Sequence, residues 1–320
     1  PGVVDPRPAE GVDAETLGGA WIHNSRSGNA QFMVPSEQAA LTLAKLVLSY
    51  LPQNNNDDPP LVTPYDSPDR MEPALNTIVP ADEREAYDMR RVLEMIVDRD
   101  SLLEVHEHWA TNAIVAFARL DGMAVGIVAN QPTVMAGSLD IDASDKISRF
   151  IRICDQYNIP LITFVDCPGY LPGVAQEYAG VIRHGAKVIY SYSQATVPMI
   201  SVVTRKAIGG SYVALSSKQM GNDVAFAWPT AQIAVMGAEG AARLLNRREI
   251  DAAADPKAAE AEFVAEYREK FFNPYRAADL GQIDEVIEPC ETRPRLIRAL
   301  EVLRTKVHIN LPKKHGLFPV

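Results

Sequence analysis

The sequence predicts an α/β protein with a parallel sheet, because a unit of apolar strand, glycine-containing loop and helix occurs twice in succession. In the first unit, a strand at residues 161–165 leads into a loop at 166–173 and a helix that runs to about residue 194. In the second unit, a strand at 198–204 leads into a loop at 205–211 and another helical stretch. The first strand shows no polar alternation, which is typical of a strand buried on both faces.

The N-terminal 80 residues divide into two parts. Residues 1–52 contain a glycine-rich patch and then a helix at 37–51, where Ala40, Leu43, Ala44, Val47 and Leu48 recur at helical spacing. Residues 53–80 are rich in Asn and Pro, a composition that disfavours both helix and sheet. We therefore predict a linker there, and a domain boundary.

A hairpin and a helix precede the first unit. Two β-rich runs at 113–120 and 123–129 are joined by Asp121-Gly122, a dipeptide favoured in tight hairpin turns. Residues 144–157 follow as a helix, with an apolar stripe at Ile147, Phe150, Ile151 and Cys154.

The remaining elements follow the second unit. We expect a strand at 233–235, helices at 238–245 and 257–271, a strand at 283–287 and a last helix at 293–306. Lys313, Lys314 and His315 form a short charged run, which indicates a solvated tail.

Composition excludes several classes of protein. The chain has 320 residues, of which 47% are hydrophobic, and no apolar run near the ~18 residues that a membrane span needs. Its 31 Lys and Arg against 41 Asp and Glu give a net charge of −10, which argues against nucleic acid as a partner. The three cysteines lie far apart without CxxC spacing, so we expect no disulfide framework, no zinc site and a reducing cytoplasmic location.

The loop at 205–211 is one candidate for chemistry. In Gly209-Gly210-Ser211-Tyr212, glycines before a helix let the backbone approach a ligand, and the free N–H groups of the first turn point outward. This is what an oxyanion hole needs. The alternative is that the glycines only permit tight packing between strand and helix, and the motif alone does not decide between them.

The loop at 166–173 is the second candidate. Gly169, Tyr170, Leu171, Pro172 and Gly173 would make a stiff, partly apolar rim suited to a flat heterocycle, with a structural turn as the equal alternative. Before the rim, the Asp166 carboxylate would act as a cap or as a bridge between segments. Cys167 is either a small buried side chain that fills space in the core or a nucleophile.

Common catalytic signatures are missing from the sequence. There is no GxSxG, HExxH, GxxxxGK[ST] or GxGxxG motif. His184 lies in a helical pattern with no nearby residue to complete a dyad, so it is more simply a packed or surface histidine. His106 and His108 have no carboxylate or cysteine at ligand spacing, so we expect no metal.

A series of motifs follows in a fixed order along the chain: Asn130-Gln131-Pro132, Ser138-Leu139-Asp140, residues 150–155, residues 158–166, Pro168-Gly169-Tyr170-Leu171-Pro172-Gly173, Gln176-Glu177-Tyr178, Arg183-His184-Gly185-Ala186-Lys187, Arg205-Lys206-Ala207, Ala227-Trp228-Pro229 and Ala234-Val235-Met236-Gly237. In this order the motifs resemble the carboxyltransferase (β) subunits of biotin-dependent acyl-CoA carboxylases. That group includes propionyl-CoA carboxylases, the transcarboxylase large subunit and the methylmalonyl-CoA decarboxylase α subunit. The resemblance runs from about Val12 to the C-terminus.

The resemblance implies a crotonase-like fold, in which each of two lobes is a spiral of ββα units. Residues 1–52 would be the tail of the N-terminal lobe, 53–80 the linker and 81–320 the C-terminal lobe. The start at Pro1-Gly2-Val3-Val4, without Met or a signal peptide, leads us to expect that most of the N-terminal lobe is missing. A biotin carboxylase or biotin carboxyl carrier partner, a hexamer of the intact subunit and a cytoplasmic location are implied as well.

The resemblance also assigns roles to the two loops. The backbone amides of Gly210 and Ser211 would form the oxyanion hole for biotin, with Gly209 allowing the turn and residues 169–173 forming the rim that meets biotin. Carboxybiotin would deliver CO₂, a ureido nitrogen would take the α-proton of a coenzyme A thioester, and no protein general base or metal would be needed.

Two residues depart from the pattern of many relatives. Ser211 stands where many have Ala, and we expect its hydroxyl to add a competing contact; Gly-Gly-Ser-Tyr resembles transcarboxylase-like members. Val213 stands where propionyl-CoA-preferring relatives have Asp, so we expect it to shift the choice of acyl chain.

We expect a carboxyltransferase that moves CO₂ from carboxybiotin to the α carbon of a short-chain acyl-CoA of the acetyl or propionyl class. One alternative is a decarboxylase or transcarboxylase that runs the same step in reverse on methylmalonyl-CoA. The other is a non-catalytic assembly lobe.

Overall fold

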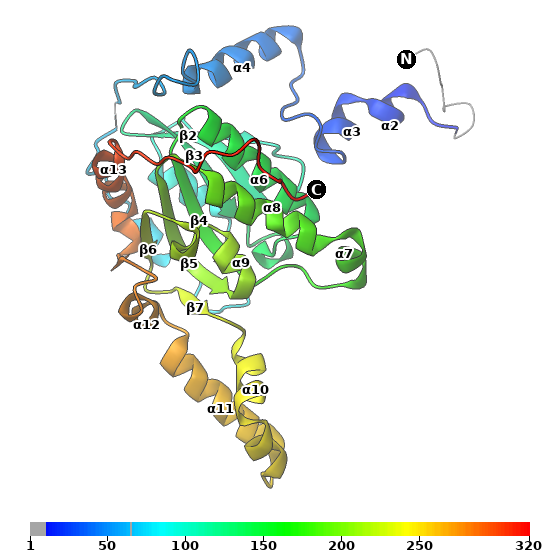
Figure 1. Cartoon of the computed structure of the whole chain (residues 1–320), viewed down its shortest axis with the longest axis vertical. Helices are drawn as coiled ribbons and strands as arrows, with labels where there is room; N and C mark the ends of the chain where they lie inside the picture. Colours follow the sequence, from blue (N-terminus) through cyan, green and yellow to red (C-terminus); the bar gives the residue numbers. More distant parts are fainter. Residues whose placement is uncertain (1–10, 65) are drawn as a thin grey trace.

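A computed structural model describes residues 11–64 and 66–320, and the predicted start at Pro1 to Val4 lies outside this part. Its centre is an eight-stranded sheet, flanked by helices on both faces (Figure 1). The strands follow the order β1-β2-β3-β4-β5-β6-β8, and β7 pairs with β5. Their bounds are β1 Leu103–Val105, β2 Ala113–Leu120, β3 Met123–Asn130, β4 Leu161–Cys167, β5 Met199–Ile208, β6 Val224–Ala227, β7 Gln232–Ala234 and β8 Glu285–Val286.

The predicted hairpin is confirmed. β2 and β3 pair antiparallel, with Leu120 opposite Met123, so the turn has two residues. Both have positive φ, 51° at Asp121 and 76° at Gly122. This is the backbone that a two-residue hairpin turn needs, and it explains the Asp-Gly dipeptide.

The predicted parallel core is confirmed as well, because β3, β4, β5 and β6 pair parallel in sequence order. The second strand is longer than predicted. β5 continues to Ile208, so Arg205, Lys206 and Ala207 belong to the strand rather than to the loop. The reason is tertiary: residues 206–208 pair with β7, which lies further along the chain.

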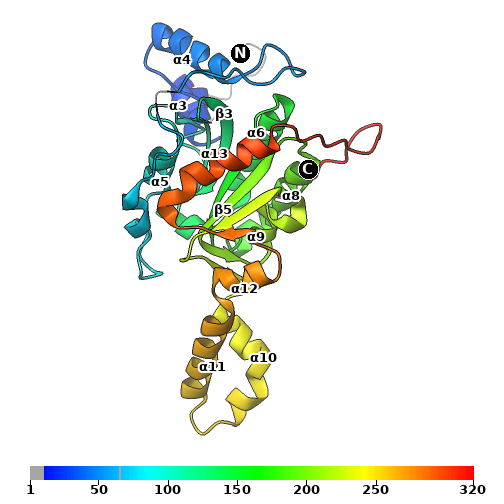
Figure 2. The ribbon, with the colours of Figure 1, turned by 90° about the vertical axis from the view of Figure 1, so that its left-hand side faces the viewer.

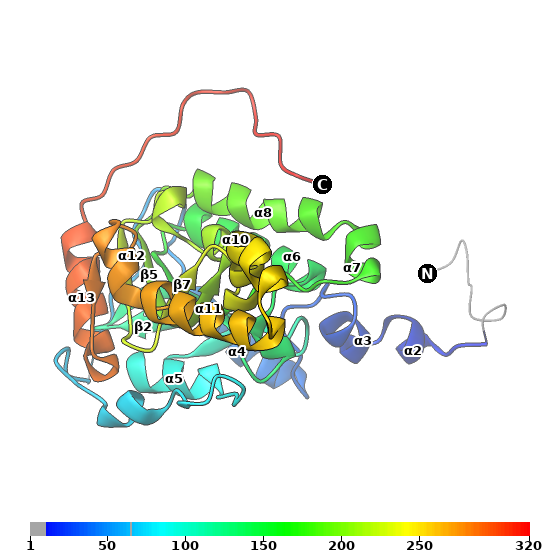
Figure 3. The ribbon, with the colours of Figure 1, turned by 90° about the horizontal axis from the view of Figure 1, so that it is seen from below.

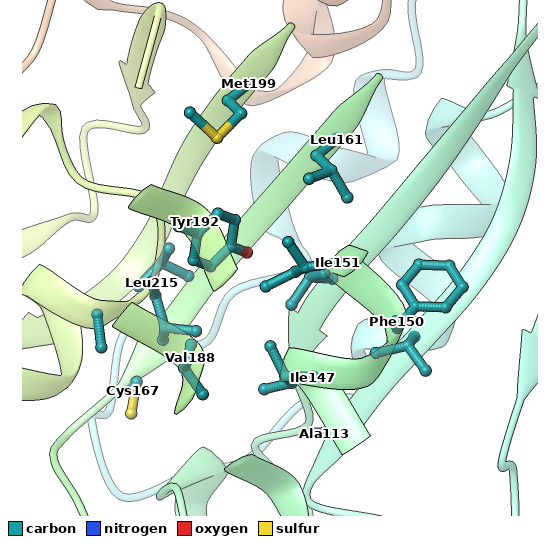
Figure 4. Close-up of a cluster of buried hydrophobic side chains, with 14 of the residues drawn as sticks. Ala113, Ile147, Phe150, Ile151, Leu161, Cys167, Val188, Tyr192, Met199 and Leu215 are labelled. Carbon is teal, nitrogen blue, oxygen red and sulfur yellow. The ribbon is translucent and has the colours of Figure 1, made fainter. Parts of the chain in front are cut away.

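Two hydrophobic cores cover the two faces of the sheet. Along β2, Val115 and Phe117 join the core under α6 (Ile141–Gln156) and α8 (Val181–Gln194), whereas Ile114 and Ala116 join the core under α5 (Met89–Ile96) and α13 (Thr292–Leu303). The two helix layers lie on opposite sides of the sheet in Figures 2 and 3. In the first core, side chains of α6 and α8 point toward each other and toward β4 and β5 (Figure 4).

Local signals fix where the helices begin. α6 begins at Ile141, three residues before the predicted start, because the Asp140 carboxylate accepts from the Ala143 amide as an N-cap. The single helix predicted after the rim is two helices, α7 (Val174–Ala179) and α8, which meet at Gly180. Gly180 has φ 90°, which interrupts the helix.

The N-terminal segment extends beyond one end of the sheet (Figure 1), and its helices bury only Asn24 and Tyr50. It contains α2 (Ala14–Gly18), α3 (Ala20–Ser25) and α4 (Glu37–Tyr50), which agrees with the predicted helix at 37–51. Among the described residues of 53–80 there is no α-helix or strand, only a 3₁₀ turn at Pro73–Thr77. This segment is packed on the sheet domain: Leu75 is buried, and the Arg70 guanidinium donates to the carbonyl oxygens of Met95 and Val97.

The C-terminal third adds an arm and a tail. α10 (Ala238–Ala252) and α11 (Pro256–Phe271) form a helical hairpin that projects from the body (Figures 1 and 2), and α10 is longer than predicted. α12 (Pro274–Asp279) leads to β8, which is shorter than the predicted strand. Lys313 to His315 are exposed, and the Lys313 ammonium donates to Gln194 on α8.

Among the described α-helices and strands, six have no predicted counterpart: α2, α3, α5, α12, β1 and β6. In the part of the chain that the structure describes, no helix has the length and apolar character to cross a membrane.

Candidate functional site

The two loops singled out in the sequence lie next to each other. β4 and β5 are neighbouring parallel strands, so the residues that follow each strand emerge at the same edge of the sheet. Residues 168–173 follow β4, and α9 (Gly209–Ala214) follows β5 directly. Carboxyl ends of parallel strands are where open α/β sheets bind ligands.

Gly209 and Gly210, which follow β5, differ in why glycine is needed at each position. Gly209 has φ 68°, and a Cβ there would lie 3.3 Å from the Val235 carbonyl oxygen, so the turn itself needs glycine. Gly210 is exposed, and an added Cβ would meet nothing within 4 Å. The backbone conformation of the turn therefore explains Gly209 but not Gly210, where the open space leaves room for a close approach by a ligand.

Ser211 and Val213 also lie in the first turns of α9. The Ser211 side chain is buried, and its hydroxyl donates to the Ile208 carbonyl oxygen at 2.9 Å. The hydroxyl therefore already has a partner inside the protein, and the expected competing contact with a ligand stays a prediction. Val213 is half-buried.

The rim at 169–173 is held by backbone bonds to Leu139. The Leu139 amide donates to the Gly169 carbonyl at 3.1 Å, and the Leu171 amide donates to the Leu139 carbonyl at 2.7 Å. Added Cβ atoms at Gly169 and Gly173 would meet nothing within 4 Å. The rim thus has a fixed base and an open outer side.

Tyr170 of the rim packs on Gly185 of α8. A Cβ at Gly185 would lie 2.8 Å from Cε1 of the Tyr170 ring, so glycine here makes the space for that ring. The Tyr170 hydroxyl donates to the Gly185 carbonyl at 3.4 Å, and burial raises the pKa of Tyr170 above its usual range. Tyr170 therefore anchors the rim rather than taking part in proton transfer.

The residues before the rim have structural roles. Cys167 is fully buried, and burial raises the pKa of its thiol to about 11, which favours packing over nucleophilic chemistry. Asp166 is buried and bridges to β5: its carboxylate accepts from the Arg205 guanidinium at 3.0 Å and from the Lys206 amide at 3.0 Å. Of the two alternatives for Cys167, the environment supports the filler, and Asp166 is the expected bridge.

His184 has a partner that the sequence analysis did not find. Both carboxylate oxygens of Asp145 lie 2.9 Å from Nδ1 of His184, and the Lys187 ammonium donates to the same carboxylate at 2.8 Å. The expectation that nothing completes a dyad is therefore wrong. Asp145 lies on α6, 39 residues upstream, and only the packing of α6 on α8 brings it there.

His106 and His108 contact the N-terminal segment. Nε2 of His106 lies 3.1 Å from the Gly28 carbonyl oxygen, and burial lowers the pKa of His106 to about 4. The ring of His108 packs on Trp21, with 5.1 Å between centroids. Across residues 11–64 and 66–320, no group of three or more His, Cys, Asp or Glu side chains is placed to hold a metal ion.

Comparison with known proteins identifies the family. The family model described as "Carboxyl transferase domain" matches residues 1–318. The chain belongs to the carboxyl transferase domain family. The resemblance predicted from the motifs is thereby confirmed.

Curated relatives of this carboxyl transferase domain have three related descriptions. It is 52% identical over 320 residues to the propionyl-CoA carboxylase carboxyltransferase subunit of Haloferax mediterranei. It is 51% identical over 321 residues to the methylmalonyl-CoA carboxyltransferase 12S subunit of Propionibacterium freudenreichii, and 50% identical over 320 residues to the methylmalonyl-CoA decarboxylase subunit alpha of Veillonella parvula. All three matches cover 100% of this chain, which spans only 61–62% of the length of those relatives.

Solved structures confirm the expected α/β, crotonase-like fold. The transcarboxylase 12S hexamer, with methylmalonyl-coenzyme A and methylmalonic acid bound, matches with a TM-score of 0.95 and 51% identity. That match covers 98% of this carboxyl transferase domain and 61% of the solved chain. A single-chain long-chain acyl-CoA carboxylase matches with a TM-score of 0.75 at 27% identity, over 92% of this chain and 29% of the other.

Leu139 and Gly185 hold the rim, but the sequence motifs that contain them give no sign of this role. Away from the two loops, the Lys146 ammonium donates to four backbone carbonyl oxygens. A lysine in an amphipathic helix carries no local signal for such a role.

Proposed function

We propose that this chain is the biotin-side lobe of a carboxyltransferase, which moves a carboxyl group between carboxybiotin and the α carbon of a short-chain acyl-CoA. Family membership supports the type of reaction. Relatives described as acting on propionyl-CoA or methylmalonyl-CoA support the acetyl and propionyl class of substrate.

The observation that carries the site is the backbone at Gly210. This glycine is exposed and has open space where a Cβ would be. Its amide and that of Ser211 belong to the first turn of α9, where N–H groups have no intrahelical acceptor. Two such amides can donate to one oxygen that gains negative charge, and each donor of this kind is worth about 3 kcal/mol in the transition state.

The chain's own residues then have distinct tasks in the proposed mechanism. Gly210 and Ser211 donate their backbone N–H groups, and Gly209 supplies the turn that aims them. The rim of Gly169, Tyr170, Leu171, Pro172 and Gly173 forms the wall for the ring system of biotin. Bound biotin supplies the carboxyl group and a basic ureido nitrogen, so no side chain of this lobe needs to move the α-proton.

Val213 is proposed to influence which acyl chain is accepted. It is half-buried on α9, three residues after Gly210, so its side chain lies on the same short helix as the proposed amide donors. Val and Asp differ in charge and polarity, so this position sets the polarity of the surface beside the proposed amide donors. Exchange for Asp is expected to change the ratio of kcat/KM for acetyl-CoA and propionyl-CoA.

The assembly is also part of the proposal. Residues 1–52 would belong to an N-terminal lobe, 53–80 to the connection and 81–320 to this lobe. The acyl-CoA would bind to the N-terminal lobe of a second subunit, in a hexamer such as the one described for transcarboxylase 12S. A biotin carboxylase or biotin carboxyl carrier protein would deliver the biotin, and the cytoplasm is the proposed location.

The test is a pair of substitutions at Gly210 in the complete subunit. Gly210→Pro removes one N–H in the first turn of α9, whereas Gly210→Ala keeps that N–H and places its Cβ in open space. With free biotin and methylmalonyl-CoA as substrates, Gly210→Pro should lower kcat about 100-fold or more, and Gly210→Ala far less. Equal activity of the two variants would exclude the amide as an oxyanion donor.

A second candidate is the same step in reverse, in a decarboxylase or transcarboxylase. Identities of 51% and 50% to subunits with those descriptions favour it nearly as well as the 52% match to a carboxylase subunit. Co-purification decides between them: a biotin carboxylase partner supports carboxylation, and a membrane ion pump supports decarboxylation. Absence of any carboxyl transfer by a correctly assembled oligomer would support a non-catalytic assembly lobe.

A further inference from the structure

The sheet is irregular between the two loops. Val165 of β4 pairs with Val203 of β5, but the next paired residues are Cys167 and Ala207. Asp166 therefore lies opposite residues 204–206, and the ladder is interrupted there. Bulges of this kind occur next to active sites, where they redirect the following residues.

Side chains replace the missing backbone bonds of the bulge. The Asp166 carboxylate accepts from the Lys206 amide through Oδ1 and from Nε of Arg205 through Oδ2, each at 3.0 Å. The Thr204 hydroxyl donates to the Val165 carbonyl at 3.2 Å. One carboxylate thus joins the end of β4 to the bulged part of β5.

The Asp166–Arg205 pair is buried and has further contacts. The Asp166 side chain is 0% exposed and the Arg205 side chain 5%. Arg205 also donates through Nη1 to the Glu85 carbonyl at 2.8 Å, and its guanidinium lies over the Tyr87 ring at 5.0 Å. A buried charge that loses its partner is strongly unfavourable, so both residues are held in one geometry.

The two residues of the pair lie in the strand ends that lead into the two loops. Asp166 is three residues before Gly169 of the rim, and Arg205 is four residues before Gly209 of the turn. With the bulge, β5 reaches Ile208 before the turn begins. If the ion pair is lost, regular backbone pairing between β4 and β5 can replace the bulge. The turn at Gly209 would then shift relative to the rim at 169–173.

We propose that Asp166 and Arg205 are positioning residues for carboxyl transfer, which fix the distance between the rim at 169–173 and the amides of Gly210 and Ser211. This inference rests on the proposed function. The pair touches neither substrate; it acts through the two loops.

The test uses Asp166→Asn and Arg205→Gln in the complete subunit. Asp166→Asn keeps an acceptor for the Lys206 amide and removes the charge. Carboxyl transfer from methylmalonyl-CoA to free biotin is measured: the α carbon loses its carboxyl group to a biotin nitrogen and receives the proton that this nitrogen gives up. Each variant should lower kcat/KM for biotin about 100-fold, because misplacement by about 1 Å costs this much, while KM for methylmalonyl-CoA changes less than about twofold.

Two further variants separate positioning from general stability. The double variant Asp166→Asn/Arg205→Gln leaves no unpaired charge and should recover about tenfold over Arg205→Gln. The control is Asp98→Asn: Asp98 and Arg293 form a similarly buried pair at 2.7 Å, with side chains 10% and 2% exposed, and neither residue belongs to β4, β5 or the two loops. Asp98→Asn should lower Tm but leave kcat/KM for biotin within about twofold of the unaltered enzyme.

The outcomes are distinguishable. If the unaltered subunit transfers carboxyl groups and Asp166→Asn does so equally well, the positioning role is wrong and the proposed function stands. If Asp98→Asn lowers kcat/KM for biotin as much as Asp166→Asn does, the pair is only structural. If the unaltered subunit in its correct oligomer transfers nothing, the proposed function fails, and the positioning role fails with it.

Discussion

Lys146 of α6 offers a sharp test of the fold around the N-terminal segment. The side chain is fully buried, and its ammonium donates to the carbonyl oxygens of His106, Trp109, Ala110 and Ala113 at 2.9, 2.9, 3.3 and 2.7 Å. These carbonyls surround the ammonium as oxygen ligands surround a metal cation. Lys146→Met keeps most of the side-chain volume and removes the charge and the donors.

The loss in free energy of unfolding follows from what happens to each of the four carbonyl oxygens. The carbonyl oxygens of His106 and Ala110 each keep a second donor, namely the amides of Trp109 at 3.1 Å and of Ala113 at 3.0 Å. The Trp109 carbonyl loses its ammonium donor. The Ala113 carbonyl also loses its ammonium donor. Ala113 and Asn130 form a non-hydrogen-bonded pair of the hairpin, because the Gln131 amide donates to the carbonyl of Asn112 instead. The bond to Ala113 is buried and the bond to Trp109 is part-buried. A buried acceptor left without a partner costs about 1–3 kcal/mol, and the Trp109 carbonyl lies at the lower end of that range, so we expect a loss of roughly 2–4 kcal/mol.

Urea denaturation measures this loss, as a lower midpoint at an unchanged m value. Burial lowers the pKa of Lys146 to about 7, and the four carbonyl oxygens oppose this by stabilising the protonated form. The measurement is made at pH 6, where the lysine is charged. The control is Lys218→Met, because Lys218 pairs with Asp284 at a more exposed site, with side chains 24% and 44% exposed. That substitution should cost about 1 kcal/mol. A cost for Lys146→Met no larger than for Lys218→Met would refute the reasoning.

Three shorter predictions concern Gly185, His106 and Cys167. Gly185→Ala places a Cβ 2.8 Å from the Tyr170 ring, so thermal unfolding should show a loss of about 1–3 kcal/mol, and an unchanged Tm would contradict this. For His106, burial lowers the pKa from 6.5 to about 4. Between these values the unfolded chain binds a proton that the folded chain does not, so stability falls as pH falls from 6.5 toward 4. His106→Gln should lack this part of the pH dependence in urea titrations at pH 7 and 5, and an equal dependence in both proteins would count against it. Cys167, with a pKa of about 11, should resist iodoacetamide at pH 8, while the less buried Cys290 reacts. Mass spectrometry of the peptides measures the labelling, and labelling of Cys167 at the rate of Cys290 would contradict a purely structural role for this thiol.

Much of the fold follows from signals within short stretches of sequence. Asp121-Gly122 predicts the hairpin because both turn residues need positive φ. The stripe from Ile147 to Cys154 predicts α6, and these side chains are buried in the core. Figure 4 shows Ile147, Phe150 and Ile151 there. The apolar strand at 161–165 predicts β4, which the structure extends by two residues to Cys167.

Local patterns fail where an element depends on a distant partner. β5 extends to Ile208 because β7 pairs with its last residues, and β7 begins 24 positions later, at Gln232. The segment at 53–80 has the composition of a free linker, yet Arg70 and Leu75 attach it to the sheet domain. Neither contact leaves a trace in the spacing of nearby residues.

The sequence by itself determined the α/β class, the two loops that follow neighbouring strands and the family to which their motifs belong. Each of these rests on residues close together in the chain, whose turn preferences and apolar spacing act locally. Only the tertiary structure decided which polar side chains meet: Asp166 with Arg205, Asp145 with His184, and Lys146 with four carbonyls. Because a buried polar group must find a partner and any segment of the fold can supply it, that choice depends on packing and not on the neighbouring sequence.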